Sequence, residues 1–232
     1  MSKALRIDRP REGILRVRLN RPARLNAINV ELLHALQEHF ASPREQVIII
    51  SSTTDRAFSA GGDLTLGADG LARLSDELYD LYRHIVQLRS VVIAAASGYS
   101  IGAGTQLLLC ADLRVLAPEA RIRFSVPERG IAGTMWSLPG LVGRSRAMEL
   151  ILTGRYVTAE EALALGLANV VHADPDAAAL ELANRVLAMP ADLVASIKRV
   201  VNMAGVPFDA LWAEQLANVM AHCEPNEKID GR

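Results

Sequence analysis

Two short, uninterrupted runs of apolar residues most constrain the fold of this chain: residues 47–50 (Val-Ile-Ile-Ile) and 91–95 (Val-Val-Ile-Ala-Ala). Such a run is typical of a strand whose two faces are both buried, as in a parallel sheet that carries helices on both sides. Between the runs, residues 71–88 place apolar side chains three and four positions apart, which predicts a helix. Strand, helix and strand in this order predict a parallel crossover sheet, so the fold class is α/β.

The flanking segments extend this alternation of strands and helices. Apolar and charged residues alternate over residues 15–19, as expected of a strand with one exposed face. Asn29 is placed to cap a helix over residues 30–40, and a short apolar helix is expected over residues 105–110. The first half is therefore predicted to be a sheet covered by helices.

The second half is predicted to be mainly helical. Residues 158–161 (Thr-Ala-Glu-Glu) form a capping box, Gly166 is placed to end the helix that follows, and a short strand is predicted at 169–172. Three more helices are predicted at 176–188, 191–203 and 207–222. The only boundary signal lies near Pro175, and it separates residues 1–174 from a C-terminal helical region, 175–232.

The composition excludes several classes of protein. The 232 residues carry 25 Lys and Arg against 26 Asp and Glu, a formal net charge of -1, and no dense basic stripe, so no nucleic-acid partner is expected. No leader-like apolar segment is seen in the first ten residues, and no stretch suits a bilayer, so no membrane role is expected. Cys110 and Cys223 do not suggest a disulfide framework, which favours a reducing compartment. We therefore expect a cytoplasmic globular protein.

Two glycine-containing turns follow predicted strands and could bind a negatively charged oxygen. The first, residues 58–64 (Phe-Ser-Ala-Gly-Gly-Asp-Leu), has small residues that leave backbone N–H groups uncovered. The second, residues 97–104 (Ser-Gly-Tyr-Ser-Ile-Gly-Ala-Gly), opens a helix whose first N–H groups have no intrahelical acceptor. Together the turns would supply the two donors of an oxyanion hole, although each alone is also an ordinary strand-to-helix turn.

The second turn also allows a serine-hydrolase interpretation. Its Gly-x-Ser100-x-Gly pattern matches the nucleophile elbow of α/β-hydrolases. The remaining members of a catalytic triad would be His172 and either Asp112 or Asp174. No His-Gly-Gly-Gly-like turn precedes the pattern, however, and this interpretation leaves the first turn without a role.

A third turn, residues 124–130 (Phe-Ser-Val-Pro-Glu-Arg-Gly), contains a candidate base. Pro127 fixes the local backbone, and Glu128 could point into a cleft and accept a proton. The alternative is a surface ion pair of Glu128 with Arg123 or Arg129, and these residues alone favour that ion pair.

Taken together, the turns and their order resemble the enoyl-CoA hydratase/isomerase (crotonase) family, over nearly the whole chain from residue 19 to about residue 205. Residues 20–27 (Asn-Arg-Pro-Ala-Arg-Leu-Asn-Ala) resemble the family's Arg-Pro…Asn-Ala signature. Residues 58–64 and 92–112 resemble its two oxyanion loops, and residues 152–167 resemble its later helical signature.

The resemblance implies a fold and a site. The fold would be a spiral of ββα units over residues 1–174, with a C-terminal helical region, 175–232, that assembles homotrimers or hexamers. The site would bind an acyl-CoA thioester; coenzyme A is part of that substrate, so no separate cofactor or metal is implied. Two backbone N–H groups would form the oxyanion hole, and six residues would line the CoA channel. The oxyanion residues would be Ala60 and Ala103, and the channel residues Ala23, Arg24, Leu25, Gly62, Asp63 and Leu64.

Two catalytic positions depart from the family pattern. Hydratases carry a glutamate two residues beyond the last glycine of the second loop, where this chain has Gln106. A neutral amide cannot take a proton from water, but it can hydrogen-bond water or substrate. The second family glutamate follows a proline, as Glu128 does, but an ungapped alignment over residues 120–130 places Val126 at that position. The family's acidic-glycine and basic-aromatic tail is also missing.

We therefore expect an enoyl-CoA isomerase-like enzyme with Glu128 and Gln106 as its catalytic side chains, because moving a double bond needs one base that removes and returns a proton. An acyl-CoA-binding family member with little or no catalysis is the first alternative. A serine hydrolase using Ser100 is the second. The acyl chain and the pathway stay open.

Overall fold

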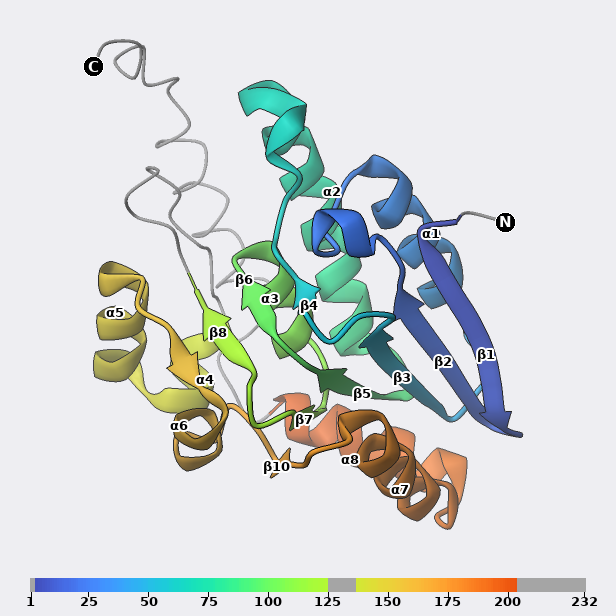
Figure 1. Cartoon of the computed structure of the whole chain (residues 1–232). Helices are drawn as coiled ribbons and strands as arrows, with labels where there is room; N and C mark the ends of the chain where they lie inside the picture. The colour runs from blue at the N-terminus through green and yellow to red at the C-terminus, as the bar shows by residue number, and fades with distance from the viewer. Residues whose placement is uncertain (1–2, 125–136, 204–232) are drawn as a thin grey trace, which may run out of the picture.

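Pairs of strands, most of them followed by a helix, make up the first half of the chain (Figure 1). The computed structural model describes residues 3–124 and 137–203. In chain order the elements are β1 (Leu5–Arg11), β2 (Ile14–Leu19) and α1 (Val30–Phe40); β3 (Val47–Ser52), β4 (Ala57–Ser59) and α2 (Gly67–Gln87); β5 (Val91–Ala96), β6 (Tyr99–Ile101) and α3 (Ala103–Leu109); and β7 (Leu113–Leu116) and β8 (Arg121–Arg123). The predicted spiral of ββα units is confirmed.

From the second pair onward, the two strands of each pair enter different sheets. Within the described residues, β1, β2 and the first strands of the later pairs form a six-stranded sheet in the order β1-β2-β3-β5-β7-β10, parallel after the β1-β2 pair. The second strands form a four-stranded sheet in the order β4-β6-β8-β9, in which β4, β6 and β8 are parallel. The last strands of these sheets are β9 (Val157–Thr158) and β10 (Val170–Val171). Parallel neighbours require crossover connections, which the intervening helices supply.

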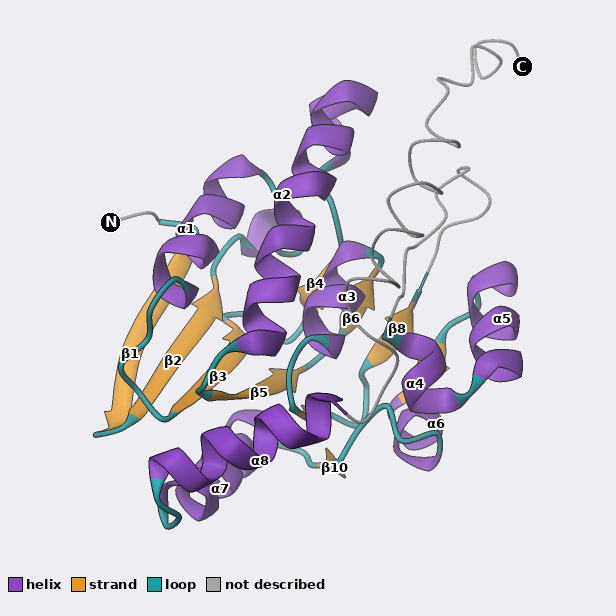
Figure 2. Ribbon diagram, turned by 180° about the vertical axis from the view of Figure 1, so that it is seen from behind, coloured by secondary structure: helices purple, strands orange, loops and turns teal. Residues whose placement is uncertain are grey.

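The six-stranded sheet is buried on both faces, which explains the uninterrupted apolar runs. Alternate residues of β3 point to opposite sides: Ile48 and Ile50 join the cluster under α1 and α2, whereas Val47 and Ile49 join the cluster under α7 (Pro175–Leu187). Figure 2 shows α7 and α8 (Ala191–Met203) on the side of the sheet away from α1 and α2. The predicted buried strands at 47–50 and 91–95 are confirmed.

The predicted capping box at residues 158–161 is only half formed. Thr158 caps α6 (Ala159–Ala164) by accepting a hydrogen bond from the Glu161 N–H at 3.2 Å. The Glu161 carboxylate pairs with Arg155 instead of reaching back to the cap, with a shortest contact of 2.7 Å. Gly166 ends the segment as predicted, with a φ of +78°. Two further helices precede this segment, α4 (Leu138–Val142) and α5 (Arg144–Thr153).

Three predicted boundaries are shifted. Helix α2 begins at Gly67 rather than at residue 71, because its first turn is helical before the apolar periodicity starts. Helix α3 begins at Ala103 rather than at residue 105, because Gly102, with a φ of +53°, completes the turn just before it. The strand predicted at 169–172 is confined to β10, the two residues that pair with β7.

The described part of the C-terminal region packs against the sheet of the same chain. Ala179 and Ala183 of α7 are fully buried in the cluster with β3 and β5, and Lys198 of α8 pairs with Asp112 at 2.7 Å. The helix predicted at 207–222 lies outside the described residues, and the homotrimer or hexamer stays a prediction. In residues 3–124 and 137–203, no helix is both long enough and apolar enough to cross a bilayer.

Candidate functional site

The two glycine turns meet at the ends of neighbouring strands. Strands β4 and β6 are parallel, with Ser59 opposite Ser100, so the turns that leave them emerge at the same edge of the four-stranded sheet. A Cβ atom on Gly61 would lie 2.8 Å from the carbonyl oxygen of Ile101 and 3.6 Å from the N atom of Ala103. Glycine at position 61 therefore lets the first turn lie directly against the start of α3.

Gly104 brings the two backbones together at a second point. A Cβ atom on Gly104 would lie 2.4 Å from the carbonyl oxygen of Ser59, closer than any real contact. Helix α3 can therefore pack on β4 only because residue 104 has no side chain.

The hydrogen bonds of the first turn show which of its N–H groups are already paired. The Ala60 N–H donates to the carbonyl oxygen of Leu25 at 2.9 Å, and the Asp63 N–H donates to that of Ile28 at 2.8 Å. The Ala60 N–H, predicted as an oxyanion donor, is therefore already paired within the protein in this structure. The Gly62 N–H has no acceptor among the described residues, so Gly62 is the donor that this turn can offer.

The second donor is the N–H of Ala103, the first residue of α3. It has no acceptor in the described part of the chain, as expected of the first turn of a helix. The donor predicted at Ala103 is thus available. With the Gly62 N–H on the adjacent turn, it forms a candidate oxyanion hole with two donors.

A buried asparagine ties the preceding loop to the first turn. Asn26 is fully buried, and its Nδ2 donates to two carbonyl oxygens of β4, at 3.1 and 3.0 Å. The backbone carbonyl oxygen of Asn26 accepts a hydrogen bond from Ser59 Oγ at 2.8 Å. Leu25 and Asn26 both have positive φ angles, 48° and 54°, a conformation that asparagine tolerates better than most residues. Residues 21–27 are therefore fixed to β4 immediately before the donor turn.

We expect Asn26→Ala to lower the free energy of unfolding by about 2–4 kcal/mol, because buried hydrogen-bond partners lose their donor. Asn29→Ala is a matched control: it removes the cap on the Leu32 N–H of α1, and it should cost about 1 kcal/mol. Urea denaturation measures both losses. Equal losses would show that Asn26 is no more than a local cap.

The predicted CoA-channel residues differ in exposure. Ala23 and Arg24 are exposed in the 3-10 turn η1 (Pro22–Arg24), and Leu64 is 48% exposed at the start of η2 (Leu64–Leu66). Leu25 is half-buried. Since the Leu25 carbonyl accepts the Ala60 N–H, the loop that carries η1 lies beside the donor turn. The exposed residues therefore flank the candidate oxyanion hole.

Asp63 does not present its carboxylate to a ligand. Its oxygens accept hydrogen bonds from the Arg21 guanidinium at 3.1 Å and from the Thr65 hydroxyl at 2.7 Å. Burial alone would raise the pKa of Asp63, but the hydrogen bonds from Thr65 and Arg21 outweigh it, and the pKa lies below its ordinary value. An ionised carboxylate here holds the two loops together and is a poor base.

Gln106 lies one turn beyond Ala103 on α3 and is buried. Its Nε2 lies 3.9 Å from the Sγ atom of Cys110. Burial raises the pKa of that thiol far above its ordinary value, so Cys110 is neutral and is not a nucleophile. The structure therefore places a buried, neutral amide one turn beyond the second donor on α3. Glu128 and Val126 lie outside the described residues.

The serine-hydrolase interpretation is wrong. Ser100 lies within β6 and is 1% exposed, whereas a nucleophile elbow requires the serine at the turn between strand and helix. Its predicted partners are used elsewhere, since Asp112 pairs with Lys198 and His172 Nδ1 contacts the backbone of Asp174.

Comparison with known proteins assigns the family. Residues 9–229 match the family model described as enoyl-CoA hydratase/isomerase. The chain belongs to the enoyl-CoA hydratase/isomerase family. The resemblance expected from the order of the motifs is thereby confirmed.

Known proteins similar to this chain in sequence and in structure support the family assignment. The probable enoyl-CoA hydratase echA6 of Mycobacterium leprae (strain TN) is 36% identical over 212 residues, which cover 88% of this chain and 84% of that protein. The enoyl-CoA isomerase/hydratase claC of Penicillium crustosum is 36% identical over 79% of this chain, which spans only 23% of that longer protein. A Thermobifida fusca YX protein solved in complex with CoA has a TM-score of 0.78 and 30% identity, over 95% of this chain and 92% of that one.

Proposed function

We propose that this family member binds an acyl-CoA thioester and polarises its carbonyl oxygen with the N–H groups of Gly62 and Ala103. The observation that carries the proposal is this pair of donors on adjacent turns, neither of which has an acceptor in the described ranges. Removing a proton beside a thioester moves negative charge onto that oxygen, and losing one such donor typically costs about 3–4 kcal/mol of barrier.

The remainder of the substrate is proposed to be coenzyme A. The relative from Thermobifida fusca YX, solved with CoA, supports this choice. The exposed Ala23, Arg24 and Leu64, together with Leu25, would line the channel, while Asp63 holds its two loops in place through Arg21 and Thr65.

The reaction is proposed to be the migration of a double bond. Isomerisation needs one base that removes a proton and returns it, whereas hydration needs groups that also activate water. Gln106 is neutral and cannot take a proton from water, but it can hold the substrate by a hydrogen bond. Glu128 is the proposed base.

Two substrates distinguish isomerisation from hydration. A 3-enoyl-CoA should be converted to its 2-enoyl isomer, and crotonyl-CoA should be hydrated at least about 10²-fold more slowly. Glu128→Gln should abolish isomerisation, since general-base catalysis contributes about 10²–10⁴-fold, and should leave thioester affinity nearly intact.

Calorimetry with the thioester and the free acid completes this test. Thioester binding without either activity would favour the acyl-CoA-binding alternative, and efficient hydration of crotonyl-CoA would contradict the isomerase assignment. Equal affinity for acid and thioester would contradict the proposed site itself.

A further inference from the structure

Helix α2 contacts both donor turns. Leu71 lies over the first turn, since a Cβ atom on Gly62 would be 3.1 Å from Leu71 Cδ2. Near the other end of the helix, the Tyr82 hydroxyl donates a hydrogen bond to the carbonyl oxygen of Ala103 at 2.7 Å. One helix therefore fixes the two turns relative to each other, by an apolar contact at the first and a hydrogen bond at the second.

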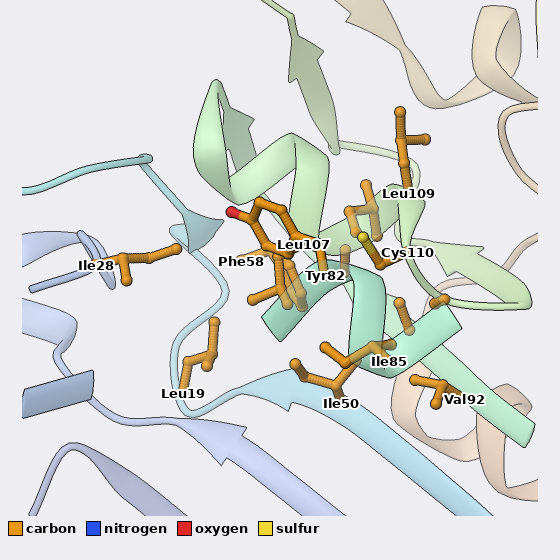
Figure 3. Close-up of a cluster of buried hydrophobic side chains, with 14 of the residues drawn as sticks. Leu19, Ile28, Ile50, Phe58, Tyr82, Ile85, Val92, Leu107, Leu109 and Cys110 are labelled. Atoms are coloured by element: carbon orange, nitrogen blue, oxygen red, sulfur yellow. The ribbon is translucent and has the colours of Figure 1, made fainter. Parts of the chain in front are cut away.

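Tyr82 makes its hydrogen bond from inside the apolar core. Its side chain is 2% exposed and belongs to a cluster that includes Phe58, Ile85 and Leu107 (Figure 3). Burial raises the pKa of Tyr82 well above its ordinary value, so the phenol stays protonated and acts as a donor. A buried hydroxyl without an acceptor is unfavourable, so this side chain holds the Ala103 carbonyl at a defined position.

Helix α3 needs such an anchor because it is short. It spans 7 residues, and the hydrogen bonds of so short a helix do little to hold its first turn in place. A helical carbonyl accepts from the residue four positions on, so Tyr82 gives Ala103 a second partner from outside the helix. The anchored carbonyl and the candidate oxyanion donor belong to the same residue, and a shift of one displaces the other.

We infer that Tyr82 is a positioning residue of the oxyanion hole, which aims the Ala103 N–H at the thioester oxygen by holding the Ala103 carbonyl. The inference rests on the proposed thioester function. Donors of this kind stabilise the transition state only when they point at the place where charge develops, so a small displacement of α3 weakens their effect.

The test compares Tyr82→Phe with Ile85→Val. Tyr82→Phe removes only the hydroxyl, whereas Ile85→Val removes one methyl group from the same helix and the same cluster. Thermal unfolding shows that both variants are folded. The readout is the infrared carbonyl band of bound butyryl-CoA labelled with ¹³C at the thioester carbon, which reports polarisation without turnover.

In the unmodified protein, the bound carbonyl band should lie at lower frequency than in free butyryl-CoA. Tyr82→Phe should reverse part of this shift and lower kcat for isomerisation by about 10-fold, with KM changed less than about twofold, while Ile85→Val changes neither. A full shift and an unchanged kcat in Tyr82→Phe would overturn the positioning role and leave the thioester function intact. No shift in the unmodified protein would overturn the thioester function, and the positioning role with it.

Discussion

Gly104→Ala is expected to lower kcat/KM for isomerisation by about 10²–10³-fold, as much as the loss of one oxyanion donor. The added methyl group would lie 2.4 Å from the Ser59 carbonyl oxygen and 2.7 Å from Ser59 Oγ. Ser59 is held in place, because β4 is paired with β6 and the Ser59 hydroxyl donates a hydrogen bond to the backbone carbonyl oxygen of Asn26. Helix α3 must move instead, and it carries the Ala103 N–H away from Gly62. Steady-state kinetics with a 3-enoyl-CoA measure the loss.

Gly140→Ala is the matched control for this change. Gly140 also lies in a helix, α4, but a Cβ atom there meets nothing within 4 Å. Alanine favours a helix over glycine, so activity should be unchanged and stability equal or slightly higher. Gly104→Ala, by contrast, should also lose about 1–3 kcal/mol through overpacking. A fully active Gly104→Ala protein would show that the two turns need not touch, and the two-donor hole would lose its structural basis.

The central sheet is predictable from the sequence because its physical signal is local. A strand buried on both faces must be apolar at every position, and residues 47–50 and 91–95 meet that condition within a few residues. The second sheet has no comparable signal. Strands β4, β6 and β8 have 3 residues each, too few to establish a periodicity, yet the pairing of β4 with β6 brings the two turns of the candidate site together.

Local sequence pattern does not show which N–H group of the first turn is unpaired. Ala60 and Gly62 are both small residues in one turn, and the sequence shows that the turn is uncovered without showing which carbonyl group covers it. The acceptor of the Ala60 N–H is Leu25, which the tertiary fold brings from another loop. Long-range backbone hydrogen bonds of this kind are set by topology, so the proposal of Gly62 in place of Ala60 depends on the tertiary fold.

The sequence does not single out the residues that support the candidate site, Tyr82 and Asn26, for a similar reason. Tyr82 fits the apolar periodicity of its helix, and nothing near it in the sequence indicates an acceptor for its hydroxyl. Asn26 does carry a signal, because it belongs to the Arg-Pro…Asn-Ala signature at residues 20–27. Its three hydrogen bonds to β4, however, form only because the tertiary fold brings the loop after β2 against β4. A polar residue within such a signature is therefore a candidate for structural support as well as for ligand contact.

Gln106→Glu is expected to raise the rate of crotonyl-CoA hydration by about 10²-fold or more over that of the unmodified protein. The side chain at position 106 is buried one turn beyond Ala103 on α3. If the thioester binds at the Gly62 and Ala103 donors as proposed, a carboxylate at position 106 could take a proton from water, which the amide cannot do. The loss of enoyl absorbance of crotonyl-CoA measures the new activity.

The pH dependence gives Gln106→Glu a second signature. Burial raises the pKa of a glutamate above its ordinary value of about 4.3, so hydration should increase as pH rises through the raised pKa and the carboxylate forms. Because the group's pKa is higher in the folded than in the unfolded state, the variant should lose stability, relative to the unmodified protein, over the same rise in pH. Gln106→Leu is the control, since it is buried without titrating and should show neither effect. Efficient hydration by the unmodified protein, or equal hydration by Gln106→Leu and Gln106→Glu, would contradict the view that the neutral amide at position 106 is what prevents hydration.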